Sequence, residues 1–226
     1  MKRGKKYLKV KEKIDKQKLY TLEEAVDFIK NNRIAKFDES IEIHLNLGID
    51  PKKAEHNIKG TVVLPYGGFS SKKIAAFVEP EKEKEAKEAG AEIVGGKELI
   101  EKIKETQKVD FDLVVATPKI IKDLTQIAKI LGPKGLMPSV KTGTLTENIK
   151  EAILELKKGK ISFKNDETGN IHQIVGKISW EKEKIIANIK NFIEAVKKAK
   201  PPKVKGDFIR KVFLCSTMGP SLQIKI

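Results

Sequence analysis

Apolar and polar residues alternate along KFDESIEIHLNLGID (residues 36–50), which predicts a β-strand with one buried and one polar face. Every second residue from Ile41 to Leu47 is apolar, and the residues between them are polar. The preceding segment, TLEEAVDFIKNN, has apolar residues three and four positions apart, as in an amphipathic helix. Thr21 and Glu24 have the spacing of a capping box, so we expect this helix to begin there.

The middle of the chain shows a different pattern, in which short apolar runs alternate with amphipathic segments. Strands are predicted at KIAAFVE, AEIVGG and FDLVVATP, and helices at PEKEKEAKEAG, KELIEKIKETQ and KIIKDLTQIAKIL. A further helix is predicted in TENIKEAILELKKG, with Thr146 as its N-cap. Alternation of this kind favours a small open sheet with helices on its faces.

The last third returns to the pattern of the first. KISFKNDETGNIHQIVGKIS predicts a β-hairpin around NDETG, and EKEKIIANIKNFIEAVKKAK predicts an amphipathic helix. IKGTVVLP, ending at Pro65, and FIRKVFLCSTMGPSLQIKI supply further strands. The first third alone has too few elements to close a core. We therefore expect an α/β protein: an α+β domain from 1–66 and 160–226, with an α/β domain, 67–159, inserted into it.

Charge separates the same two parts of the chain. The 226 residues include 46 Lys and Arg against 31 Asp and Glu, a net charge of +15. Residues 67–159 hold 17 Lys and 15 acidic residues, so the two flanking parts carry +13 of the total. Such an excess predicts an acidic partner, and nucleic acid is the first candidate because lysine and arginine neutralise phosphates. A solvated lysine-rich surface is the alternative.

Cysteine use and hydropathy bear on the compartment. The single cysteine excludes an intramolecular disulfide and fits a reducing cytoplasm. The longest apolar run, Ile74 to Val78, is too short to cross a membrane, and no apolar stretch follows the basic residues 1–18 as in a secretory signal. We expect a soluble cytoplasmic protein that has no membrane contact and is monomeric when free.

Catalytic and metal-binding patterns are not evident. The histidines, His44, His56 and His172, lie far apart in the sequence, and no cysteine cluster accompanies them. No G-x-S-x-G nucleophile motif occurs, and Cys215 in KVFLCS is expected to be a small core residue. The sequence therefore predicts no catalytic residue, no metal site and no cofactor.

One loop, LGPKGLMPSVKTGT (131–144), leaves two interpretations open. It matches neither G-x-G-x-x-G nor the P-loop motif. Its glycines could hold an anion against backbone N–H groups beside Lys134 and Lys141, or could serve a turn-rich connector. A nucleotide-binding module or an enzyme built on the inserted domain therefore stays as an alternative function.

Three segments of the flanking domain carry groups that an RNA reader needs, namely apolar surface and small polar groups. Phe37 precedes the polar strand face of Ser40 and Glu42. FKNDETGNIH offers Lys164, Asp166, Thr168 and His172, and STMGP offers Ser216, Thr217, Met218 and Gly219. A nonspecific basic coater of nucleic acid is a second alternative.

These segments resemble the large-subunit ribosomal protein L1 family in its bacterial form. KFDESIEIHLNLGID is similar to the family's first strand motif, FKNDETGNIH to its central hairpin and STMGP to its C-terminal signature, while LGPKGLMP resembles its second-domain motif. The resemblance extends from near Tyr20 to Ser221. It departs from the family pattern at LPYGGFSSKK and at SVK after LGPKGLMP.

The resemblance implies a hinge between the domains and a Rossmann-like inserted domain without nucleotide chemistry. It implies binding to the mobile stalk of large-subunit rRNA in the ribosome, near exit-site tRNA, and repression through the own-operon mRNA. The implied rRNA-binding residues are Lys36, Phe37, Ser40, Glu42, Lys164, Asp166, His172, Ser216, Thr217, Met218 and Gly219. An implied secondary RNA contact involves Gly132, Lys134, Gly135 and Lys141.

Overall fold

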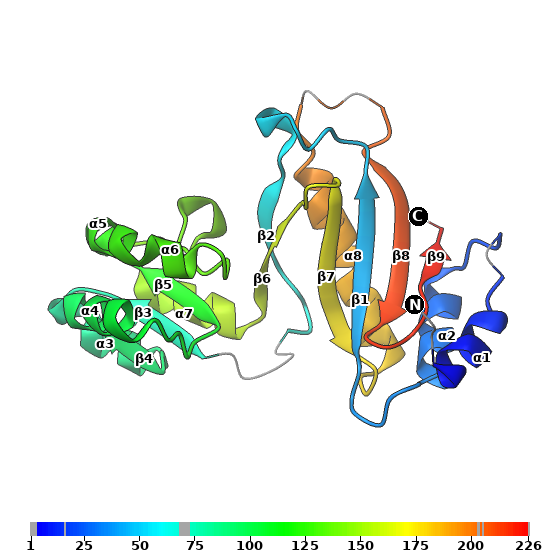
Figure 1. Cartoon of the computed structure of the whole chain (residues 1–226), viewed down its shortest axis with the longest axis horizontal. Coiled ribbons are helices and arrows are strands. Elements are labelled where there is room, and N and C mark those ends of the chain that lie inside the picture. Colours follow the sequence, from blue (N-terminus) through cyan, green and yellow to red (C-terminus); the bar gives the residue numbers. More distant parts are fainter. Residues whose placement is uncertain (1–3, 16, 68–72, 203, 205, 226) are drawn as a thin grey trace. The chain divides into compact units, whose positions relative to one another are not determined.

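The chain has an α/β fold that divides into two compact units. One unit consists of residues 1–69 and 161–226, and the other of residues 70–160 (Figure 1). The computed structural model describes residues 4–15, 17–67, 73–202, 204 and 206–225, without the side chains of Ala54 and Lys141. No helix in this described part is both long and apolar enough to span a membrane.

The unit that contains both chain ends is built on a four-stranded antiparallel sheet, β7-β1-β8-β9 (Figure 1). Its strands are β1 (Ser40–Leu47), β7 (Asn170–Lys177), β8 (Ile209–Ser216) and β9 (Leu222–Ile224). The first strand in the chain lies in the middle of the sheet, because Ile43 pairs with Gln173 of β7 and with Leu214 of β8. Segments far apart in the sequence thereby form one surface.

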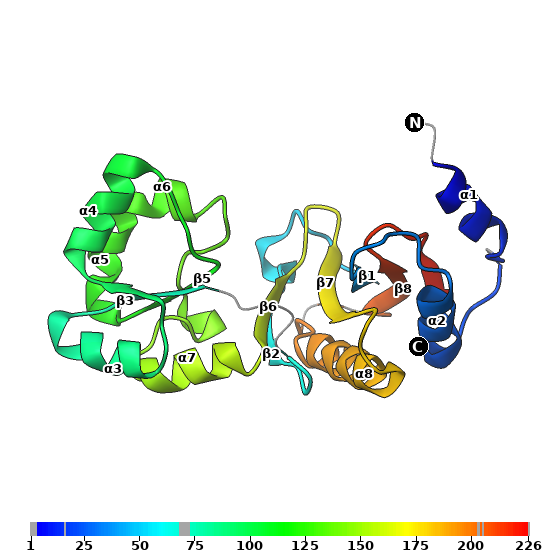
Figure 2. The same cartoon turned by 90° about the horizontal axis from the view of Figure 1, so that it is seen from below.

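Helices α2 (Leu22–Asn31) and α8 (Lys182–Lys198) pack against this sheet and against each other (Figure 2). The predicted capping box at Thr21 and Glu24 is confirmed. The predicted apolar stripe of α8 and the apolar residues of β1 are all buried in one core. The alternating polar residues of β1 are half-buried, so this side of the strand keeps polar groups within reach of solvent. Helix α1 (Lys5–Glu12) has no buried residue.

The predicted hairpin at 160–179 is wrong in its pairing. Strand β6 (Lys160–Lys164) pairs with β2 (Lys59–Val63) in a separate two-stranded sheet, whereas β7 joins β1. Asn165 fixes this arrangement through two hydrogen bonds to Ile58. The side-chain oxygen of Asn165 accepts from the backbone amide of Ile58 at 2.7 Å, and the backbone amide of Asn165 donates to the Ile58 carbonyl at 3.2 Å. The turn that follows is present, although it connects two different sheets.

The second unit contains a parallel three-stranded sheet, β4-β3-β5, between two helical layers. Its strands are β3 (Ile74–Phe77), β4 (Ile93–Gly95) and β5 (Leu113–Ala116). One face packs on α3 (Glu83–Glu88) and α7 (Ile149–Lys157), and the other on α4 (Lys97–Thr106), α5 (Ile121–Leu124) and α6 (Ala128–Leu131). All four β3 residues are buried, as expected of a strand covered on both sides.

Two local predictions in this unit are wrong. The segment expected as one helix from 119 to 131 is divided, because 3-10 turns at Pro118–Ile120 and Thr125–Ile127 interrupt it. Thr146 is not the cap of α7, which begins after Asn148, and the Thr146 hydroxyl instead accepts from the Asn148 amide at 3.2 Å.

Candidate nucleic-acid interface

The loop before β1 presents Phe37 to solvent while its backbone is held in place. The guanidinium of Arg33 donates to the carbonyls of Ala35 at 2.9 Å, Lys36 at 2.6 Å and Phe37 at 2.7 Å. The Phe37 side chain is 55% exposed despite its size. An aromatic ring displayed on a fixed backbone offers a stacking surface to a base or a ribose.

The turn after β8 lies beside the start of β1, because Ile41 pairs with Ser216. The Thr217 amide donates to the Ser40 carbonyl, and the Ser40 amide donates to the Thr217 hydroxyl, both at 3.0 Å. Met218 follows with 52% exposure. The turn brings a second exposed apolar side chain to the same end of the sheet as the loop that carries Phe37.

Gly219 closes this turn. Its amide donates to the Ser216 carbonyl at 3.1 Å, and a β-carbon added to Gly219 would lie 2.5 Å from the Ser216 hydroxyl oxygen. The buried serine leaves little room for such a group, since Ser216 is only 5% exposed. A larger residue at 219 would therefore displace the turn.

A buried carboxylate, Glu39, joins the loop and the turn. One oxygen accepts from the amides of Ile34 and Ala35, at 3.2 and 2.7 Å, and the other accepts from the Met218 amide at 3.2 Å. Burial opposes ionisation, but these donors and the Ser216 hydroxyl outweigh it and hold the pKa of Glu39 below its ordinary value. Glu39 thus keeps the segments of Phe37 and Met218 together as an ionised group.

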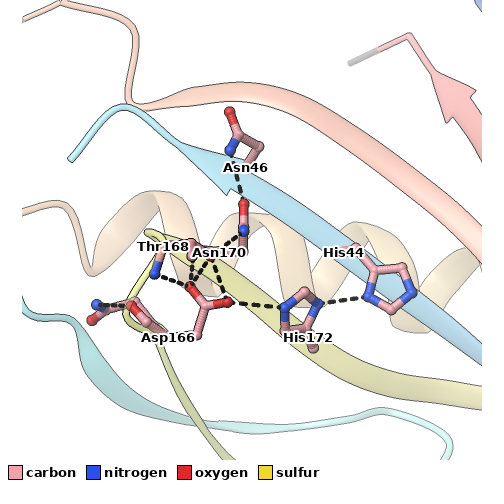
Figure 3. Close-up of polar contacts among 7 residues, drawn as sticks. His44, Asn46, Asp166, Thr168, Asn170 and His172 are labelled. Carbon is pink, nitrogen blue, oxygen red and sulfur yellow. Dashed lines mark hydrogen bonds and ion pairs between the residues drawn. The ribbon is translucent and has the colours of Figure 1, made fainter. Parts of the chain in front are cut away.

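Polar side chains continue from this end along β1 and β7 (Figure 3). His44 and His172 occupy paired positions, with their Nδ1 atoms 2.8 Å apart. The other nitrogen of His172, Nε2, lies 3.3 Å from an oxygen of Asp166. Because a carboxylate only accepts, His172 donates through Nε2. In the neutral ring Nδ1 of His172 is then the acceptor, so His44 donates through Nδ1.

Asp166 is also the hub of the turn before β7 (Figure 3). Its carboxylate accepts from the amides of Thr168 at 2.9 Å and Asn170 at 2.7 Å, and from the Thr168 hydroxyl. Although desolvation acts in the opposite direction, these donors and His172 lower the pKa of Asp166 to about 2. The group sets the shape of the turn and orients His172.

Cys215 is not the core residue that the sequence predicts. It is half-buried beside β1, with its sulfur 3.1 Å from Nε2 of His44, and Glu42 is its pairing partner in the strand register. Burial and the charge of Glu42 raise the pKa of the Cys215 thiol to about 11. Burial and the neighbouring His172 lower the pKa of His44, with Glu42 acting in the opposite sense.

The structure brings together histidine and cysteine side chains that lie far apart in the sequence, in which we predicted no metal site. Glu42, His44 and Cys215 each offer one ligand atom, and these atoms all lie within 4.8 Å of one another. The sequence conceals this cluster because 171 positions separate His44 from Cys215, and only the pairing of β1 with β8 brings them together.

Other predicted residues are placed with different degrees of access. Lys36, Lys164 and Thr217 are exposed, whereas Ser216 is buried and contributes through Glu39. The Ser40 hydroxyl accepts from the Lys177 ammonium at 2.9 Å.

The set of RNA-binding residues predicted from the sequence does not include Arg33, Glu39 or Lys177. The sequence does point to Glu39, because this acidic residue stands two positions before Ile41, where the alternation of β1 places a buried side chain. Arg33 and Lys177 carry no comparable signal.

The loop 131–144 does not form the anion nest considered from sequence. The amides of Gly132, Gly135 and Gly143 donate to the carbonyls of Ala128, Gly132 and Val140, at 2.7, 2.9 and 3.0 Å. Backbone donors already bonded within the chain cannot cradle a phosphate without rearrangement. Lys134 is exposed, and the side chain of Lys141 lies outside the described residues.

Comparison with known proteins agrees with the resemblance seen in the sequence. The model of the "Ribosomal protein L1p/L10e family" matches residues 29–220. "Large ribosomal subunit protein uL1" of Persephonella marina is 44% identical over 228 residues, covering 100% of this chain and 94% of that protein. The protein of the same name from Thermus thermophilus is 47% identical over 224 residues, covering 99% of this chain and 97% of its own length. The chain therefore belongs to the ribosomal L1 family, whose members are proteins of the large ribosomal subunit.

Proposed function

We propose that this ribosomal protein binds the mobile stalk of large-subunit rRNA through the surface that carries Phe37, Thr217 and Met218. The observation that supports it most directly is the pair of exposed apolar side chains, Phe37 at 55% and Met218 at 52%. The buried carboxylate of Glu39 accepts from the Met218 amide and from the Ala35 amide in the loop that carries Phe37, and so connects the two segments. Exposed apolar groups on a fixed backbone suit contact with sugar and base faces. The protein works in the cytoplasmic ribosome as a structural component.

The surrounding charges supply affinity and selectivity in this proposal. The part of the chain outside 67–159 carries +13, which favours phosphate contacts and a strong dependence on salt. The half-buried carboxylate of Glu42 accepts hydrogen bonds from guanine amino groups or ribose hydroxyls. Release of deacylated tRNA at the exit site and repression of the protein's own mRNA follow from binding stalk-like RNA, and both belong to the proposal.

The test is the affinity for a stalk RNA hairpin in filter binding at fixed salt. Met218→Ala removes an exposed apolar group and should weaken binding by roughly 1–2 kcal/mol, about five- to thirtyfold, while the fold is retained. Thr217→Val removes the hydroxyl that accepts from Ser40 and should weaken binding as well.

Leu154→Ala is the matched control, since Leu154 is 41% exposed on the other unit and lies outside the loop 131–144. Affinities equal to that of the native chain in both test variants would refute the assigned surface. Equal affinity for the stalk hairpin and an unrelated duplex at moderate salt would instead favour a nonspecific basic coater.

A second candidate function has one observation in its favour. A cavity of about 780 Å³ lies where β3 and β4 end, the edge at which parallel α/β sheets bind ligands. Glu79 lines it, with one carboxylate oxygen that has no hydrogen-bond partner among the described residues. Glu83 and Glu98 are also in the lining, together with Lys97 and Lys102, so the lining has no excess of positive charge to attract an anionic nucleotide. A ligand at 100 times its Kd would stabilise this unit by about 2.7 kcal/mol, so thermal unfolding with each nucleotide tests the alternative.

A further inference from the structure

We infer that Glu42, His44 and Cys215 form a binding site for a thiophilic divalent cation, with Zn²⁺ as the best match, on the polar side of the four-stranded sheet. The site goes beyond the proposed RNA binding and does not depend on it. Its three ligand atoms are a carboxylate oxygen, an imidazole nitrogen and a sulfur, all within 4.8 Å of one another.

The sheet itself builds this arrangement. Glu42 and His44 are two positions apart on β1, so their side chains point to the same side of the strand. Cys215 of β8 pairs with Glu42, and its sulfur lies 3.1 Å from Nε2 of His44. Ligand bonds of about 2.0–2.3 Å in a tetrahedral zinc site place the ligand atoms roughly 3.3–3.7 Å from each other. Side-chain adjustments of under about an ångström therefore suffice, without movement of the strands.

A chain of hydrogen bonds behind His44 prepares it for this role (Figure 3). Asp166 accepts from Nε2 of His172, and Nδ1 of His172 accepts from Nδ1 of His44. The proton of the neutral His44 ring is thereby held on Nδ1, and Nε2, which faces Cys215, keeps its lone pair. Metal-binding histidines commonly donate their second ring nitrogen to such a partner, which fixes the tautomer and orients the ring.

The donor set selects the class of ion. A thiolate with an imidazole suits zinc and disfavours Mg²⁺ and Ca²⁺, which prefer oxygen ligands. On binding, the Cys215 thiol loses its proton to solvent and its sulfur forms the bond to the metal, so that one thiolate and one carboxylate balance the two positive charges. With three protein ligands, a fourth position is open to water or to an added ligand.

Nucleophilic catalysis is a weaker interpretation of the same residues. A cysteine nucleophile needs a thiolate at neutral pH, whereas burial and the nearby Glu42 raise the pKa of Cys215 to about 11. A bound cation reverses this situation, since it stabilises the thiolate directly.

Titration of the full chain with Co²⁺ in the absence of RNA tests the inference, with Zn²⁺ as competitor. The native protein should bind one Co²⁺ per chain and develop a thiolate-to-cobalt charge-transfer band, which Zn²⁺ then removes. Cys215 is the only cysteine, so Cys215→Ser should abolish the band. His44→Gln should weaken Co²⁺ binding at least about tenfold, and His56→Gln, which changes a histidine outside the cluster, should not.

His172→Leu tests the positioning role, because it leaves all three ligands but removes the acceptor of His44. The affinity for Co²⁺ should fall by about 10–100-fold while the charge-transfer band is retained at saturation. Absence of the band in the native chain would overturn the metal site. If His44→Gln binds Co²⁺ as tightly as the native protein does, the thiol alone holds the metal and the three-ligand site is refuted. Circular dichroism of each variant separates loss of binding from loss of fold.

Discussion

At the scale of single residues, Glu39 shows how a charge inside the core can hold an exposed surface in shape. Its carboxylate accepts from three backbone amides in two segments that lie about 180 residues apart in the chain. Glu39→Gln keeps the size but turns one acceptor oxygen into a donor, which then faces an amide N–H. We expect a loss of about 1–3 kcal/mol in the unfolding free energy and a weaker affinity for stalk RNA.

Urea unfolding followed by the fluorescence of Trp180, the only tryptophan, measures this loss in the unit that contains Glu39. Glu194→Gln on the exposed side of α8 is the control, for which we expect a change within about 0.5 kcal/mol. Equal stability of Glu39→Gln and Glu194→Gln would show that the buried contacts are not needed.

Asp166 gives a prediction for the dependence on pH. Its pKa falls from 3.8 to about 2 on folding, so the unfolded chain binds the proton more tightly. The stability that the ionised group contributes is complete above pH 3.8 and is lost as the pH falls through about 2.

We therefore expect Asp166→Asn to be less stable than the native chain at neutral pH, with the difference shrinking below about pH 4. The unfolding free energy of both proteins against pH, again followed by Trp180, provides the measurement. Asp207→Asn, at an exposed carboxylate of the same unit, should show no such convergence. If the difference in unfolding free energy between the native chain and Asp166→Asn stays constant down to pH 2, the lowered pKa of Asp166 is contradicted.

At the scale of elements, the sequence predicts what local chemistry determines and misses what depends on strand partners. The alternation in β1, the capping box of α2 and the stripe of α8 are all confirmed, since each arises from one continuous segment. The partner of β6 could not be predicted, because it depends on the contact between Asn165 and Ile58. The environment of Cys215 was missed for the same reason, as it depends on the pairing of β8 with β1.

Helix α8 provides a prediction at this scale through Asn188, a fully buried polar side chain. Its amide donates to the carbonyls of Tyr66 and Val175, both at 2.8 Å, and its oxygen accepts from the Tyr66 amide at 3.1 Å. Asn188→Leu keeps the number and branching of side-chain heavy atoms but leaves these backbone groups without partners. We expect a destabilisation of about 2–4 kcal/mol, from the desolvated groups that remain.

The comparison is with Lys190→Ala, an exposed change on the same helix that should alter stability by under about 0.5 kcal/mol. Urea unfolding of both variants by Trp180 fluorescence distinguishes them. Equal stabilities would mean that water replaces the lost partners of Tyr66 and Val175.

At the scale of the whole molecule, the two units differ in net charge and also have separate hydrophobic cores. The residues flanking 67–159 hold a net +13, and their apolar residues form a single core that includes no residue of the inserted unit. The inserted sheet has its own buried residues on both faces. Each unit therefore has the means to fold by itself, and the basic one carries the proposed RNA surface.

This division leads to the last prediction. Deletion of residues 67–159, with the ends joined by a short glycine linker, should leave a folded protein that binds stalk RNA within about tenfold of native affinity. The junction is compatible with the fold because β2 and β6 pair, with Ile58 bonded to Asn165 and Gly60 packed on Phe163. The slope of log K against log salt should also persist, since it reflects the phosphates neutralised by the retained lysines and arginines. A shortened chain that folds, judged by Trp180 fluorescence and circular dichroism, but shows a much flatter salt slope would place the principal phosphate contacts on the inserted unit and refute the proposed division of roles.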